Sequence, residues 1–295
     1  MTDGPPQQPA ITACVIARDE AANLAELLPL LRWADEVLVL IDDGSQDDSA
    51  DVATLMADRV EVRPFQSFST FRNLAIDLAR GRWIFFVDAD ERVSAALANE
   101  IRAAITSANA HPEPVEGPDH SPSAHPEPVK GRTTERDEET TESSEPAAYW
   151  VARHNIVFGR LLRGGGWSPD NQLRLLRRGR CRYDESHLVH ETVAVDGATG
   201  NLSQRLLHFN YATLEDFFRK QRRYTAMEAE ALRSSGPPRR RSYLGAPLRA
   251  FVHRFFRLGG WVDGPVGLFL SLAMAYYAFE RVRIARKRDE RAALD

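Results

Sequence analysis

The stretch FFVDADE, residues 85–91, joins a run of apolar side chains to three acids. The apolar run predicts a buried strand, which the preceding residues extend to RWIFFVD. Buried strands commonly end at glycine, proline or asparagine, whereas this one ends at Asp88, Asp90 and Glu91. Because side chains alternate along a strand, Asp88 and Asp90 are expected to point to one side of the backbone. Either these acids form a solvated turn, or they hold something positive.

Strands and helices alternate around this stretch. Three more strands are expected at ITACVIA (11–17), EVLVLID (36–42) and RVEVRPF (59–65). Apolar spacing and capping residues predict helices over 20–31, over 45–57 with Ser45 as N-cap, over 69–79 and over 94–107. This order predicts an α/β fold with a mostly parallel sheet, in which ligands bind beyond the carboxyl ends of the strands. Asp42, Asp43, Asp88 and Asp90 all lie at such ends.

Composition narrows the class of protein. The net charge of −4 gives no uniform basic field, so nucleic acid is not an expected partner. Cys14 and Cys181 are too few for a disulfide framework, which fits a reducing compartment. The N-terminal residues lack the basic and apolar regions of a signal peptide. We therefore expect a cytoplasmic protein.

Residues 109–147 interrupt the α/β pattern. AHPEPVEG at 110–117 recurs as AHPEPVKG at 124–131, and a segment rich in Thr, Ser and Glu follows. Seven prolines and the lack of a large apolar cluster predict a disordered insertion. Its histidines are expected to be solvated rather than metal ligands.

The C-terminal part is basic and aromatic. Residues 233–291 contain thirteen Arg or Lys against four Asp or Glu. From about residue 246, Trp, Phe and Leu beside Arg are typical of a helix lying on anionic lipid, and equally of a helix that covers the catalytic domain. The most apolar stretch, 265–279, is about fifteen residues, whereas a spanning helix needs roughly 20. No transmembrane helix is therefore expected.

The acidic strand ends suggest chemistry with a metal and a nucleotide. Two close carboxylates repel each other unless a cation neutralises them, and oxygen ligands favour Mg²⁺ or Mn²⁺ bridging to substrate phosphates. Asp42 and Asp43 could accept the N3–H of uracil or a ribose hydroxyl, or only cap the next helix. Arg72, in FRN at 71–73, could reach a base or a phosphate, or be an ordinary surface arginine.

Five motifs occur together and in a fixed order: VIARDEAANL, ADEVLVLIDDGSQDDS, FRNLAIDLARGRWIFFVDADERV, PDNQLRLLRRG and LVHE. In combination they resemble family-2 glycosyltransferases of the GT-A fold, in particular the bacterial subgroup that contains lipopolysaccharide-core β-glucosyltransferases. The resemblance covers about 11–107 and 148–225, and GGWVDGPVGLFLS at 259–271 resembles the C-terminal region of that subgroup. Asp19 departs from the usual Asn, and the family does not need the insertion.

The resemblance implies a nucleotide-sugar donor, expected to be a UDP-hexose, a Mn²⁺ or Mg²⁺ ion on the DxD motif, and inversion at the anomeric carbon. It implies Glu191 as the catalytic base, with Asp170, Asp184 and Glu185 in reserve. The implied donor-binding residues are Arg18, Asp42, Asp43, Arg72 and Asp88, the implied metal ligands Asp88, Asp90 and His208, and the implied acceptor-binding residues Trp167, Asp170 and His190. The alternatives are that Glu191 is an exposed strand carboxylate, and that His208 and Trp167 are core residues.

The expected organisation has five segments. They are a disordered N-terminus (1–10), a nucleotide-sugar-binding half of the GT-A domain (11–108), the disordered insertion (109–147), an acceptor-side half (148–212) and a helical, basic C-terminal region (213–295). The last segment could place the protein on the cytoplasmic face of the inner membrane.

Three other functions fit the sequence less well. A sugar nucleotidyltransferase needs a glycine-rich loop after the first strand, where this chain has ARDEAANL. A non-catalytic membrane adaptor on the same fold should have lost the DxD motif or Glu191, and both remain. A processive synthase needs transmembrane helices and a Gln-x-x-Arg-Trp motif after the base. The preferred function is therefore an inverting transferase acting on a glycan or lipid-linked acceptor in cell-envelope polysaccharide or lipopolysaccharide-core synthesis.

Overall fold

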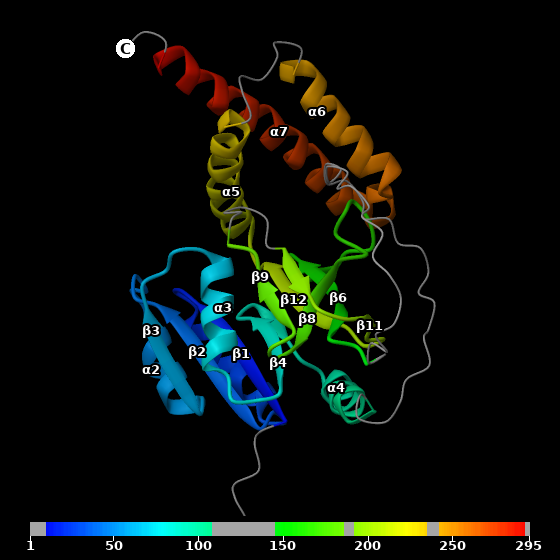
Figure 1. The fold of residues 1–295 in the computed structure, drawn as a ribbon. Coiled ribbons are helices and arrows are strands. Elements are labelled where there is room, and N and C mark those ends of the chain that lie inside the picture. Colours follow the sequence, from blue (N-terminus) through cyan, green and yellow to red (C-terminus); the bar gives the residue numbers. More distant parts are fainter. Residues whose placement is uncertain (1–9, 108–144, 186–191, 235–241, 293–295) are drawn as a thin grey trace, which may run out of the picture.

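The computed structural model describes residues 10–107, 145–185, 192–234 and 242–292, whose arrangement is shown in Figure 1. The expected N-terminal segment and insertion lie outside the described residues, apart from residue 10 and residues 145–147. His190 and Glu191 also lie outside them.

The first half alternates strands and helices, as the sequence predicts. Its elements are β1 (Ile11–Ala17), α1 (Ala21–Leu27) with a 3₁₀ turn (Leu28–Leu31), β2 (Glu36–Asp42), α2 (Ser49–Met56), β3 (Arg59–Arg63), α3 (Phe68–Leu78), β4 (Trp83–Asp88), β5 (Glu91–Arg92) and α4 (Ala95–Ser107). The expected start of the second helix at Ser45 is wrong, because α2 begins four residues later. The Asp47 carboxylate accepts hydrogen bonds from the backbone N–H groups of Ser49 and Ala21. These bonds keep the residues between β2 and α2 out of the helix.

The second half adds short strands and then helices. They are β6 (Ala148–Val157), β7 (Arg160–Leu161), β8 (Asn171–Arg177), β9 (Cys181–Tyr183), β10 (Val193–Val195), β11 (Thr199–Asn201), β12 (Leu206–Tyr211), α5 (Leu214–Ser234), α6 (Ser242–Val252), a π-helical turn (His253–Arg257), a 3₁₀ turn (Gly260–Asp263) and α7 (Gly264–Ala292).

One mixed sheet contains most of the strands, in the order β3-β2-β1-β4-β8-β6-β12-β5. Strands β3, β2, β1 and β4 are parallel, β8 runs antiparallel to β4 and β6, and β12 is parallel to β6. The chain order reverses beside β1, where α/β sheets commonly bind ligands. The expected α/β class with a mostly parallel sheet, flanking helices and a C-terminal helical region is confirmed.

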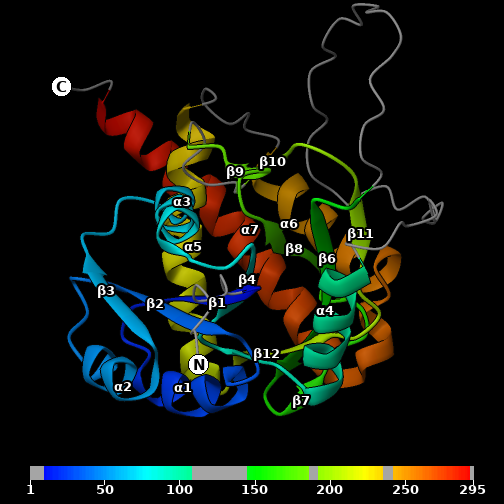
Figure 2. The same ribbon diagram turned by 60° about the horizontal axis from the view of Figure 1, so that its bottom comes forward.

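Alternating side chains build a core on each face of the sheet. Odd-numbered β1 residues such as Ala13 and Val15 pack with leucines of α1 and with α4, whereas Cys14 packs with α3. Figure 2 shows α1 and α2 on one face of the parallel strands and α3 on the other. The continuous apolar runs in β1, β2 and β4 follow from this double covering.

The sheet curls so that its two halves meet at the acidic turn. Strands β4 and β5 are separated only by Ala89 and Asp90, yet three other strands, β8, β6 and β12, lie between them in the sheet order. Strand β5 pairs with β12, with Glu91 opposite His208, and the backbone N–H of Phe209 donates to the Asp90 carbonyl at 2.9 Å. The DxD motif is therefore the link that joins the parallel strands to the second half.

The C-terminal helices pack against one another above the sheet (Figure 1). The segment Gly260–Arg286 is long and apolar enough to cross a membrane by length and composition, and only 28% of its most apolar window is buried. The apolar segment is therefore longer than the fifteen residues counted in the sequence, because it begins at Gly260 and continues to Arg286. Length and composition are also met by core helices of soluble proteins, so they do not establish a span.

Candidate active site

The carboxylate of Asp88 lies among three arginines from three different elements. Arg174 of β8 donates to both of its oxygens, one at 3.1 Å, Arg72 of α3 donates to Oδ1 at 3.2 Å, and Nη1 of Arg153 lies 3.8 Å from Oδ2. Burial raises the pKa of Asp88, but the charges of Arg174, Arg72 and Arg153 outweigh it and hold the pKa well below its usual range. Asp88 is therefore ionised and fully compensated by protein groups.

Glu91 extends this ionic network into the interior. Its side chain is fully buried and accepts from Arg174 at 2.8 Å, from Arg153 at 3.3 Å and from the backbone N–H of Asp88 at 2.9 Å. Burial raises the pKa of Glu91, and Arg174 and Arg153 oppose that rise. The hydrogen bond from the backbone N–H of Asp88 to Glu91 fixes the conformation of the turn that carries the DxD motif.

Asp90 faces a different set of partners. Its Oδ1 lies 3.5 Å from Nε2 of His208, and its Oδ2 lies 3.6 Å from Nζ of Lys220 on α5. Burial raises the pKa of Asp90, but His208 and Lys220 outweigh this effect, so the net shift is downward. The two aspartates of the motif therefore have separate surroundings, arginines for Asp88 and a histidine with a lysine for Asp90.

The side chain of Asn155 decides how His208 is protonated. Its Nδ2 donates to the Trp167 carbonyl at 2.7 Å and to Asp170 Oδ2 at 2.8 Å, so its Oδ1 must face Nδ1 of His208 at 2.7 Å. An amide oxygen only accepts, so Nδ1 carries a proton, and a neutral ring then turns the Nε2 lone pair toward Asp90. A bare nitrogen facing a carboxylate needs a second proton or a cation between them.

Asp90 and His208 fit a divalent metal on this observation. Carboxylate oxygen suits Mg²⁺ and Mn²⁺, and neutral imidazole is a common metal ligand. Among the described residues, no group of three or more His, Cys, Asp or Glu side chains could hold a metal ion. A cation here would take its remaining ligands from substrate phosphate and water, as Mg²⁺ commonly does.

Replacing Asn155 with alanine is expected to weaken Mn²⁺ binding by about 10–100-fold, because groups that orient a ligating histidine typically contribute that much. Electron paramagnetic resonance of free Mn²⁺ during a titration measures the affinity. Asn210→Ala is the matched control, since Asn210 makes only a 3.4 Å hydrogen bond to the same oxygen. Equal affinity of the Asn155 variant and the wild type would contradict the assigned role.

The ends of β1 and β2 form one hydrogen-bonded loop region. Asp42 is buried and accepts from Arg18 Nη1 at 2.9 Å and from the backbone N–H of Gly44 at 2.9 Å. Asp43 is exposed. Asp19 has a left-handed backbone with φ of 54° and accepts from the backbone N–H of Gln46 at 2.6 Å. The departure from the usual Asn thus places a third carboxylate in this region, besides those of Asp42 and Asp43.

The expected acceptor residues in the described part of the chain are largely engaged. Asp170 accepts from Arg153 and Asn155 at 2.8 Å each, and Arg153 with these bonds outweighs burial and lowers its pKa. Trp167 is half-buried and packs edge-on against Tyr211, with ring centroids 5.9 Å apart. Asp170 is therefore a poor reserve base, while contact of Trp167 with a sugar stays a prediction.

The residues flanking the undescribed segment 186–191 are anchored beside the site. Asn73 of α3 accepts from the backbone N–H of Tyr183 at 2.9 Å and donates to Glu185 Oε1 at 2.6 Å. The backbone N–H of Asp184 donates to the Thr192 carbonyl at 2.8 Å. Arg72 donates both to the Tyr183 hydroxyl at 3.4 Å and to Asp88, so it joins the hairpin of β9 and β10 to Asp88.

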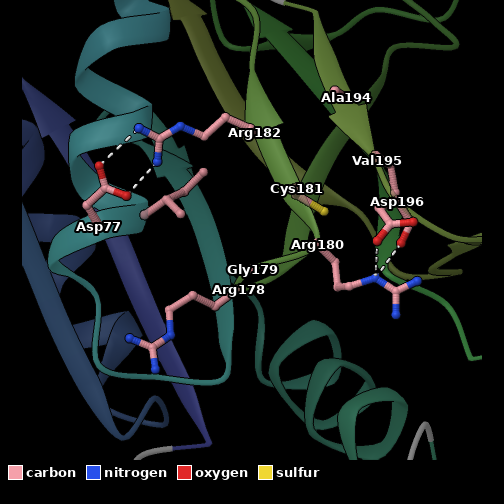
Figure 3. A pocket seen from close by; sticks show the side chains of 10 residues that line it. Asp77, Arg178, Gly179, Arg180, Cys181, Arg182, Ala194, Val195 and Asp196 are labelled. Atoms are coloured by element: carbon pink, nitrogen blue, oxygen red, sulfur yellow. Dashed lines mark hydrogen bonds and ion pairs between the residues drawn. The ribbon is translucent and has the colours of Figure 1, made fainter.

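A hollow of about 620 Å³ lies away from this site, between α3 and the β9–β10 hairpin. Figure 3 shows that two of its arginines are turned toward carboxylates, Arg182 toward Asp77 and Arg180 toward Asp196. The hollow adjoins the amino end of β4, where Trp83 pairs with Arg177, and not the DxD end. The acidic turn remains the candidate site.

Comparison with known proteins agrees with the resemblance in the sequence. Residues 12–111 match the model of Glycosyl transferase family 2. The lipopolysaccharide core biosynthesis glycosyltransferase LpsC of Rhizobium meliloti (strain 1021) is 27% identical over 281 residues, which cover 91% of this chain and 89% of that protein.

Two solved structures have more distant likenesses. S. aureus TarS 1–349 in complex with UDP is 12% identical, covering 97% of this chain and 91% of that one, with a TM-score of 0.42. The mannosyltransferase PcManGT of Pyrobaculum calidifontis, in complex with GDP-Man and Mn²⁺, is 24% identical over 33% of this chain and 32% of that one, with a TM-score of 0.29.

The matched residues 12–111 contain nearly all of the first half of the fold, including the acidic turn. Over those residues the chain is similar to Glycosyl transferase family 2, and over nearly its full length it is similar to LpsC, which together support glycosyltransferase activity.

Proposed function

We propose that the protein is an inverting, metal-dependent hexosyltransferase that uses a UDP-sugar and acts on a lipid-linked or glycan acceptor. The observation that carries this proposal is the Asp90–His208 pair, whose carboxylate oxygen and imidazole nitrogen lie 3.5 Å apart at the end of β4 and are both ligand types that a divalent cation accepts. The similarity to LpsC, named for lipopolysaccharide core biosynthesis, supports an acceptor in the lipopolysaccharide core or a related envelope glycan.

The residues around Asp90 would hold the diphosphate side of the donor. Asp90 and His208 would hold Mn²⁺ or Mg²⁺, which when bound stabilises the leaving diphosphate as a Lewis acid. Lys220, 3.6 Å from Asp90, offers a second positive charge that can swing onto a phosphate oxygen. Asp88 keeps Arg72, Arg153 and Arg174 in place rather than serving as the principal metal ligand.

The uridine side of the donor would lie at the ends of β1 and β2. Asp43 is exposed there and can accept a uracil N3–H or a ribose hydroxyl, whereas Asp42 is already bonded to Arg18. Arg18 is half-exposed and can reach a base or a phosphate. We assign the polar contacts of the nucleoside to Asp43 and Arg18.

The acceptor side would use Glu191 as the general base. The acceptor oxygen forms a bond to the anomeric carbon while the bond from that carbon to the diphosphate oxygen breaks. The hydroxyl proton passes to the Glu191 carboxylate, and the electron pair of the broken bond leaves with the diphosphate. Attack from the face opposite the leaving group inverts the anomeric configuration. The anchoring of the neighbouring Tyr183, Glu185 and Thr192 beside Arg72 and Asp88 supports this placement.

Replacing Asp90 with asparagine is expected to abolish the Mn²⁺-dependent thermal stabilisation by UDP. The substitution removes the charge that faces His208 but leaves the arginines on Asp88 in place. Differential scanning fluorimetry with UDP, with Mn²⁺ and with both measures the effect. Asp77→Asn, which alters an exposed ion pair, is the matched control and should behave as wild type.

A UDP–Mn²⁺ shift that persists in full in the Asp90 variant would place the metal elsewhere and overturn the proposed site. Transfer or hydrolysis assays with UDP-glucose, UDP-N-acetylglucosamine and GDP-mannose identify the donor. Turnover with GDP-mannose alone would contradict the uridine assignment.

A further inference from the structure

Helices α6 and α7 and the connection between them carry a set of large apolar side chains that face solvent. This hairpin surface is defined by Leu248, Phe256, Trp261, Val262, Leu268 and Leu272. Trp261 is 61% exposed and Leu272 is 53% exposed. Single exposed apolar side chains are common, but a set of this size on two helices and their connection points to a surface that contacts a partner or a membrane.

The part of the hairpin surface that lies on α7 is the side of this helix that does not pack against the rest of the described chain. One side of α7 places Leu270 and Tyr277 against Phe217 of α5. Another side meets the connection before the helix so closely that a Cβ added to Gly267 would lie 1.8 Å from the carbonyl oxygen of Gly260. Leu268 and Leu272 follow each other at a spacing of four residues on the side left free.

The charges around this surface favour an anionic partner. Residues 245–275 contain three arginines and one acid. Arg249 and Arg257 are exposed, and so is Arg163 at the same end of the hairpin. The acid, Asp263, accepts the backbone N–H groups of Arg163 and Gly164 at 2.9 Å each, so its charge is engaged within the protein.

The hairpin is joined rigidly to the acceptor side of the candidate site. Besides the two bonds to Asp263, the backbone N–H of Gly165 donates to the Leu258 carbonyl at 2.8 Å, and Arg254 donates to the Gly165 carbonyl at 2.8 Å. A Cβ on Gly164 would lie 2.2 Å from the Gly259 oxygen, so the two segments touch through their backbones. The same loop continues to Trp167, whose carbonyl orients Asn155.

We propose that the hairpin surface docks on an anionic lipid bilayer, with its aromatic and aliphatic side chains in the interfacial region and its arginines on lipid phosphates. Trp, Phe and Leu beside Arg suit that interface. The contact with lipid does not depend on the reaction. Its consequence, that the acceptor side of the site is held close to the membrane that carries a lipid-linked acceptor, rests on the proposed function.

Sedimentation of the full chain with vesicles tests the proposal. Vesicles of phosphatidylcholine alone are compared with vesicles that also contain phosphatidylglycerol. We expect binding to the anionic vesicles, with each exposed arginine near the surface contributing about fivefold to the partition coefficient. Raising the salt from about 0.1 M to about 1 M shortens the screening length from about 10 Å to about 3 Å and should release the protein.

The double variant Trp261→Glu/Leu272→Glu should bind anionic vesicles at least about tenfold more weakly, since two apolar contacts are lost. Leu55→Glu is the matched control, because Leu55 is an 84% exposed leucine on α2 outside the hairpin. A second variant, Arg249→Glu/Arg257→Glu, tests the charges without altering the apolar side chains. The UDP–Mn²⁺ thermal shift of every variant reports on the donor site separately from lipid binding.

Three results would overturn the proposal. One is equal binding of the wild type to neutral and anionic vesicles. Another is wild-type binding by both double variants. The third is a protein that alkaline carbonate and high salt leave in the membrane and only detergent releases, which would mean that α7 spans the bilayer instead.

Discussion

Replacing Arg174 with alanine is expected to lower the free energy of unfolding by about 3–5 kcal/mol, the usual cost of removing one partner from a buried ion pair. Arg174 is only 2% exposed and lies between Asp88 and Glu91. Without it, Asp88 and Glu91 would share the guanidinium of Arg153. Arg72 would still pair with Asp88. Urea unfolding followed by circular dichroism measures the loss.

Arg182→Ala provides the control for this prediction. Arg182 also binds an aspartate through two nitrogens, but its side chain is 52% exposed and that of Asp77 is 56% exposed. An exposed pair contributes about 0–1 kcal/mol, so this variant should unfold almost as the wild type does. Similar losses in the two variants would mean that burial does not set the strength of the Asp88 network.

Replacing Glu191 with glutamine is expected to reduce turnover by about 10²–10⁴-fold, the usual contribution of a positioned general base. The acceptor hydroxyl is barely acidic at neutral pH, so its proton must move as the new bond forms. Glutamine keeps the size of the side chain but cannot take the proton. Donor and metal binding should stay near wild type, because the proposed function assigns them to residues other than Glu191. Measuring kcat and KM separately would show this division.

Glu185→Gln is the matched control for the base. Glu185 is an exposed glutamate that accepts from Asn73 in the same region of the chain. Its replacement should leave turnover largely intact. If Glu191→Gln retained its turnover while substitution of Glu185 or Asp184 abolished it, Glu191 would not be the base.

The sequence was a good guide wherever local pattern determines structure. The apolar runs at 11–17 and 36–42 match β1 and β2 residue for residue, because strands covered on both faces have little choice of side chain. The position of Asp42 at a carboxyl end followed from the second of these runs, and that of Asp88 from the run that forms β4. The start of α2 was missed because an Asp47 side chain competes for the backbone N–H groups that a helix would use.

The partners of the acidic turn were harder to predict because they come from distant segments. Arg174 did leave a signal, since it is a charged residue between the leucines of the strand NQLRLLR. Lys220 and Asn155 left none, because only the curl of the sheet and the packing of α5 bring them to Asp90 and His208. The length of α7 was underestimated because its C-terminal part is charged, although it continues the same helix.

The curled sheet also limits what the first half of the chain can do by itself. The family match ends at residue 111, whereas Arg174, which neutralises Asp88, lies 86 positions after that aspartate in the chain. A fragment ending before residue 145 would keep the DxD sequence but would lack Arg174 and His208. It would therefore contain the motif without forming the site. The segment between the halves lengthens that connection at little cost, since doubling a loop adds only about 0.6 kcal/mol of closure entropy. The length of the segment between the halves can therefore vary, whereas the contact between Asp88 and Arg174 must be kept.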